Sequence, residues 1–96
     1  MAAEAANYIA AHKNKPFSMS YWAFSVHCPW QAKPALIEKY RGRIKPDSPQ
    51  KNSLYAAMVE SLDQSVGRLT DAVDTAGLRD NTIFVFFSNN GGRATL

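Results

Sequence analysis

The chain has 96 residues, of which 46% are hydrophobic and 20% are charged, and its net charge is +3. This composition is typical of one small globular domain and excludes a disordered polar chain. The single cysteine excludes an internal disulfide bond and a cysteine-based zinc site. No stretch approaches the ~20 apolar residues that span a bilayer. Residues 1–15 also lack the pattern of a secretory signal peptide.

The alanine-rich N-terminal stretch predicts a helix over residues 2–12. One face of this helix carries Ala5, Tyr8, Ile9 and His12. Asn14 and Pro16 end it, and His12 is expected to act as a favourable positive charge at its C-terminus. Residues 17–25 then predict a strand, because apolar Phe17, Met19 and Tyr21 occupy alternate positions.

Residues 26–34 contain two prolines and are expected to form a loop that leaves this strand. Residues 34–40 predict one or two helical turns, and residues 41–50 predict a linker-like excursion with glycine and prolines. Four basic residues cluster here, namely Lys39, Arg41, Arg43 and Lys45. We interpret them as a solvated surface in preference to a nucleic-acid patch, and expect neither a nucleic acid nor a membrane as partner.

The longest element is a helix predicted from about residue 51 to residue 75. Apolar residues recur at spacings of three or four: Leu54, Met58, Leu62, Val66, Leu69, Val73 and Ala76. Asn52 or Ser53 is expected to cap its start, and Gly77 stands where a left-handed C-terminal cap belongs. Tyr55 and Val59 are expected to widen the buried face. The residues expected to face solvent are Glu60, Asp63, Gln64, Arg68 and Asp71.

After a short turn at residues 78–81, Ile83 to Phe87 form an apolar run that predicts a strand covered on both faces. The polar sequence Ser88, Asn89, Asn90, Gly91 and Gly92 follows it directly. Ligands of open α/β sheets lie beyond the carboxyl ends of the strands, and the two amide oxygens suit a hard cation or a polar substrate. A crossover helix favours parallel pairing of the two strands, so the loops after Ser25 and Ser88 are expected to face each other.

Two stretches of the chain resemble the sulfatase family of the alkaline phosphatase superfamily. YAAMVESLDQSVGRLTDAVDTAGLRDNTIFVFFSNNGG resembles the family's helix, strand and metal loop, and KPFSMSYWAFSVHCPWQAKP resembles its strand and HxP loop. The resemblance implies an α/β fold, a partial alkaline phosphatase-like sandwich in the order helix, strand, loop, long helix, strand. Residues 1–96 are accordingly expected to form a single partial sulfatase-like domain.

The resemblance also implies roles for individual residues. Asn89 and Asn90 occupy the positions of the family's calcium-binding Asp-Asn pair, and His27 occupies that of the histidine that hydrogen-bonds the sulfate. Pro29 matches the proline of the HxP motif, with Cys28 between the two. Considered without the resemblance, His27 fits an ordinary loop histidine, and the Asn-Asn-Gly-Gly sequence fits an ordinary turn.

Two departures from the family pattern matter for the chemistry. Asn89 replaces an aspartate, which removes one negative charge from the cation site. The C/SxPxR motif, whose first residue becomes the catalytic formylglycine, does not occur, and Cys28 begins CPWQA instead. The resemblance therefore implies a segment of a sulfatase-like hydrolase that cleaves sulfate esters with calcium and with a formylglycine outside this chain. This segment alone is expected to be inactive.

Two other readings stay open. One is a non-catalytic binding or interaction module derived from a decayed sulfatase, and the other is a phosphoester or phosphonate hydrolase of the same superfamily. The resemblance implies a sulfate-ester small molecule or a sulfated glycan as the partner of the full-length relative. With its sheet incomplete, the run Ile83 to Phe87 is also expected to self-associate through an open edge.

Overall fold

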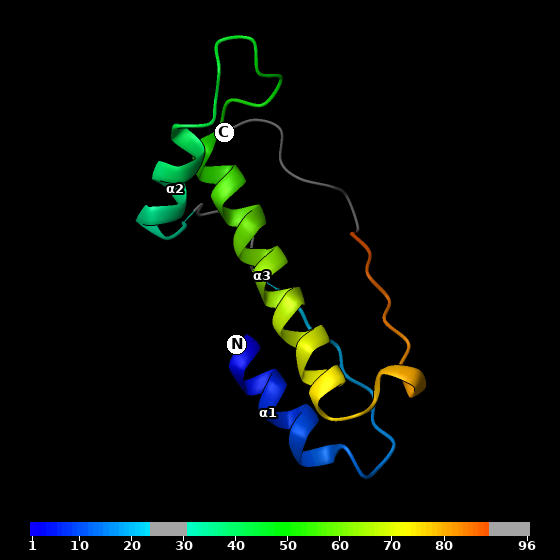
Figure 1. The fold of residues 1–96 in the computed structure, drawn as a ribbon. Helices are drawn as coiled ribbons and strands as arrows, with labels where there is room; N and C mark the ends of the chain where they lie inside the picture. The colour runs from blue at the N-terminus through cyan, green and yellow to red at the C-terminus, as the bar shows by residue number, and fades with distance from the viewer. Residues whose placement is uncertain (24–30, 89–96) are drawn as a thin grey trace. The chain divides into compact units, whose positions relative to one another are not determined.

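The computed structural model describes residues 1–23 and 31–88. Its regular elements are α1 (Ala2–His12), α2 (Pro34–Arg41), α3 (Ser53–Thr75) and the 3₁₀ helix η1 (Arg79–Asn81), shown in Figure 1. The described residues form two compact units, one of residues 1–22 and 64–88 and the other of residues 23 and 31–63. The single-domain organisation predicted from the sequence stays a prediction. None of the helices in the described ranges has the length and hydropathy to cross a membrane.

Helix α3 begins and ends where the local sequence predicts. The side-chain oxygen of Asn52 accepts a hydrogen bond of 2.9 Å from the backbone N–H of Tyr55, which is the expected N-terminal cap. Beyond Thr75, Gly77 has φ 74°, a left-handed conformation that favours glycine. The backbone N–H of Leu78 then reaches the carbonyl of Val73 at 3.0 Å, so the chain turns back immediately after the helix.

The first unit is held together by a small apolar cluster between α1 and the C-terminal part of α3. Ile9, Leu69 and Val73 form its buried centre. Residues that pack against this centre are Ala5, Phe17, Met19, Tyr21, Ala72, Ala76 and Leu78. The helical stripe predicted from the sequence is confirmed at these positions, because its members meet on one side of α3.

Tyr8 departs from the predicted apolar face of α1. Its side chain is exposed and stacks on the ring of His12, with 3.9 Å between the ring centroids. The Nδ1 atom of His12 lies 2.9 Å from the backbone carbonyl of Tyr8. The Tyr8 ring also lies edge-on to Phe17, with 5.9 Å between the ring centroids, so Tyr8 borders the apolar cluster without being buried in it.

In the second unit, Ala57 and Met58 are buried, but two other expectations for α3 were wrong. Val59 is 45% exposed and does not widen the buried face. Glu60, predicted to face solvent, has a side chain only 16% exposed, and its two carboxylate oxygens accept hydrogen bonds of 2.8 and 3.0 Å from the ammonium group of Lys39. The ion pair joins α2 to α3, which periodicity within α3 alone does not reveal.

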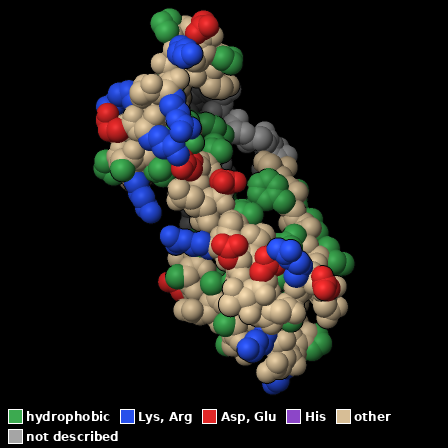
Figure 2. All heavy atoms as spheres, in the orientation of Figure 1, with side chains coloured by type: hydrophobic (Ala, Val, Ile, Leu, Met, Phe, Trp, Pro, Cys, Tyr) green, Lys and Arg blue, Asp and Glu red, His purple; other side chains and the backbone are tan. Residues whose placement is uncertain are grey.

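The basic residues around α2 are partly neutralised by neighbours. Lys39 pairs with Glu60, and Arg41 pairs with Glu38. The guanidinium of Arg43 lies 5.9 Å from the ring centroid of Tyr40. Figure 2 shows Lys and Arg side chains gathered over this part of the chain. The interpretation as a solvated surface stays a prediction, and the structure adds that several of these cations have neighbouring partners.

The two predicted strands are not confirmed, since no strand occurs within residues 1–23 and 31–88. In the first segment the alternation itself is present: Phe17, Met19 and Tyr21 are half-buried, whereas Ser18, Ser20 and Trp22 are exposed. The second segment, Ile83 to Phe87, is exposed along its whole length and is not covered on either face. A strand exists only through hydrogen bonds to a neighbour, and neither segment pairs with another described segment.

Candidate functional site

The residues predicted to carry the chemistry lie outside the described residues. These are His27 with its neighbours Cys28 and Pro29, and the pair Asn89 and Asn90. The predicted approach of His27 to the asparagines and the predicted facing of the two loops therefore stay predictions. What it does describe are the segments that lead into both loops.

Both leading segments start from the same packed region of the first unit. Phe17, Met19 and Tyr21 pack against the cluster of Ile9, Leu69 and Val73 on the way to His27. Leu78 packs against this cluster as well, at the start of the segment that runs toward Asn89. The apolar cluster thus anchors the beginning of both segments.

The turn between α3 and the second segment is reinforced by an ion pair with two hydrogen bonds. The Nε of Arg79 donates to Oδ1 of Asp74 at 2.8 Å, and its Nη2 donates to Oδ2 at 2.5 Å. The hydrogen bond from Arg79 holds the pKa of Asp74 below its usual value of 3.8. The pair also offsets the unfavourable position of a carboxylate at a helix C-terminus.

We expect Arg79→Gln to lower the free energy of unfolding at neutral pH and to have no effect in strong acid. The folded-state pKa of Asp74 is depressed, so its stabilising contribution is present above the usual value of 3.8 and is lost as the pH falls through the folded-state pKa. Urea unfolding at both pH values measures the difference. Arg68→Gln, the same change at an exposed position of α3, is the control. A loss that persists in acid would contradict the assignment to this ion pair.

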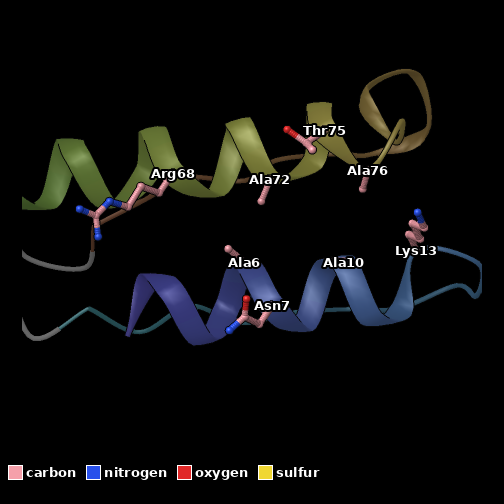
Figure 3. A pocket seen from close by; sticks show the side chains of 8 residues that line it. All are labelled: Ala6, Asn7, Ala10, Lys13, Arg68, Ala72, Thr75 and Ala76. Carbon is pink, nitrogen blue, oxygen red and sulfur yellow. The ribbon is translucent and has the colours of Figure 1, made fainter.

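Helices α1 and α3 leave a hollow of about 340 Å³ between them. Small side chains form much of its lining, and Figure 3 shows Arg68 and Lys13 toward its opposite ends. The lining residues are Ala6, Asn7, Ala10, Lys13, Arg68, Ala72, Thr75 and Ala76. Because these residues include two cations and no carboxylate, the hollow suits a neutral or anionic group better than a metal ion.

Sequence reasoning did not single out this hollow. The available signal was the spacing of alanines four residues apart on both helices, at Ala6 and Ala10 and again at Ala72 and Ala76. Small residues at that spacing lie on one helix face and leave space between the helix backbones.

Other electrostatic features of the described residues do not form a metal site. No three histidine, cysteine, aspartate or glutamate side chains within residues 1–23 and 31–88 lie close enough together to hold an ion. On α2, the hydrogen bond to Glu60 raises the pKa of Tyr40 above its usual value of 10.0. Tyr40 and Lys39 both contact Glu60, which makes this carboxylate a structural link between two helices.

The chain belongs to the sulfatase family, because the sulfatase family model matches residues 1–95. It is 30% identical to human arylsulfatase D and 34% identical to human arylsulfatase H, in each case over 96% of this chain. An uncharacterized sulfatase of Schizosaccharomyces pombe is 29% identical over 88% of this chain. No solved structure shows significant similarity.

The chain spans only a small part of these relatives. The matched region covers 14% of human arylsulfatase D, 15% of human arylsulfatase H and 24% of the S. pombe sulfatase. Family membership supports the α/β fold class at the level of the family, whereas the individual strands remain unconfirmed. It also supports a general use of a divalent cation, without identifying the ion.

Proposed function

We propose that this chain contributes part of the active site of a hydrolase that cleaves sulfate esters. The observation that carries the proposal is the match of the sulfatase family model to residues 1–95. In this proposal Asn89 and Asn90 bind calcium, His27 binds the sulfate group, and a formylglycine outside these 96 residues is the nucleophile. The substrate is a small sulfate ester or a sulfated glycan.

Asn89 and Asn90 fit calcium by the chemistry of their donor atoms. Ca²⁺ takes oxygen ligands, and amide oxygens are among those it accepts. Two neutral amides bring no negative charge, and calcium affinity rises with the number of charged ligands. A weak site is therefore expected. When bound, the ion supplies electrostatic stabilisation of the charge on the sulfate oxygens.

His27 is the residue of this chain that binds the substrate in our proposal. A ring N–H of its imidazole donates a hydrogen bond to a sulfate oxygen, and the bond is stronger when the acceptor is charged. The side chain thereby orients the sulfate and stabilises its negative charge. It does not attack sulfur, so the chain binds the substrate without turning it over.

The test is an assay of the 96-residue chain with an aryl sulfate in excess Ca²⁺, combined with a binding measurement by NMR. We expect binding without turnover, with binding lost in His27→Ala and retained in His12→Ala. His12 lies at the C-terminal end of α1 and is a matched control. Turnover proportional to the amount of chain and abolished by His27→Ala would contradict an external nucleophile. Equal binding by both variants would contradict the role of His27.

A non-catalytic binding module is the second candidate, and the neutral residue Asn89 is the observation that favours it. The sequence encoded upstream of these 96 residues distinguishes this binding module from a sulfatase segment. A C/SxPxR motif there supports the sulfatase, and a stop codon without such a motif supports the binding module. A phosphoester or phosphonate hydrolase, the third candidate, instead needs an upstream threonine nucleophile, or a cysteine or serine in a different context.

A further inference from the structure

We draw no further inference here: the strongest candidate, the alanine-lined hollow between α1 and α3 with Lys13 and Arg68 toward its ends, rests on a stripe of small residues in a chain that spans only a small part of its relatives, and nothing in the structure shows what covers or fills it.

Discussion

Replacing Val73 by alanine should lower the free energy of unfolding by about 2 kcal/mol. The side chain of Val73 is only 3% exposed and lies with Ile9 and Leu69 at the centre of the cluster that joins α1 to α3. The substitution removes buried methyl groups and leaves a cavity that the neighbours fill only in part. The better helix propensity of alanine offsets a few tenths of a kcal/mol of this loss.

Val59→Ala is the matched control, because it makes the same change in the same helix at a position that is 45% exposed. Its effect on stability should stay within about 0.5 kcal/mol. Urea denaturation followed by circular dichroism measures both variants. Equal losses would mean that α1 does not pack on this part of α3 in solution. The apolar cluster would then not anchor the segments that lead toward His27 and Asn89.

Asn89→Asp should increase calcium affinity by on the order of tenfold, or about 1.4 kcal/mol. The proposed site lacks one negative charge, and the substitution supplies a carboxylate at that position. Because the amide and the carboxylate have nearly the same shape, the change alters charge without requiring new space. Isothermal titration calorimetry with Ca²⁺ gives the two dissociation constants directly.

The control for this prediction is Asn81→Asp, which adds the same charge at an exposed position of η1. If the gain in affinity is local to the metal loop, Asn81→Asp should bind calcium no better than the native chain. A similar gain in both variants would mean that calcium responds only to the net charge, and the assignment of Asn89 as a ligand would fail.

The helices could be predicted closely from the sequence because their signals are local. The apolar spacing along α3, the cap at Asn52 and the left-handed residue Gly77 all lie within or next to the helix they define. The same holds for α1, where alanine content and the stop at Asn14 and Pro16 set the limits. Local signals of this kind do not depend on how the rest of the chain folds.

Two of the expectations that were not met concern contacts between segments distant in sequence. Periodicity predicts that Glu60 is a solvated residue of α3, yet it pairs with Lys39, which lies 21 residues away on another helix. The apolar run Ile83 to Phe87 predicts a covered strand, but covering it needs a partner that periodicity does not supply. Pairing partners of strands are nonlocal, and so the two strands stay predictions.

The candidate site was predicted from sequence motifs and not from a cavity in the structure. The spacing of the HxP loop and of the Asn-Asn-Gly-Gly loop pointed to the sulfatase family, and the match to residues 1–95 confirms the family. The roles of His27, Asn89 and Asn90 remain predictions, because these residues lie outside those that the structure describes. The hollow beside Arg68 was missed because alanines carry no chemical signature of their own.

A two-dimensional amide NMR spectrum of the 96-residue chain, recorded with and without excess Ca²⁺, directly tests the proposed calcium and sulfate site. We expect dispersed signals, with those of His27, Asn89 and Asn90 shifting on calcium addition while those of α1 stay in place. A dispersed spectrum in which calcium moves none of these three signals, or moves only those of the acidic residues of α3, would contradict the proposed calcium and sulfate site.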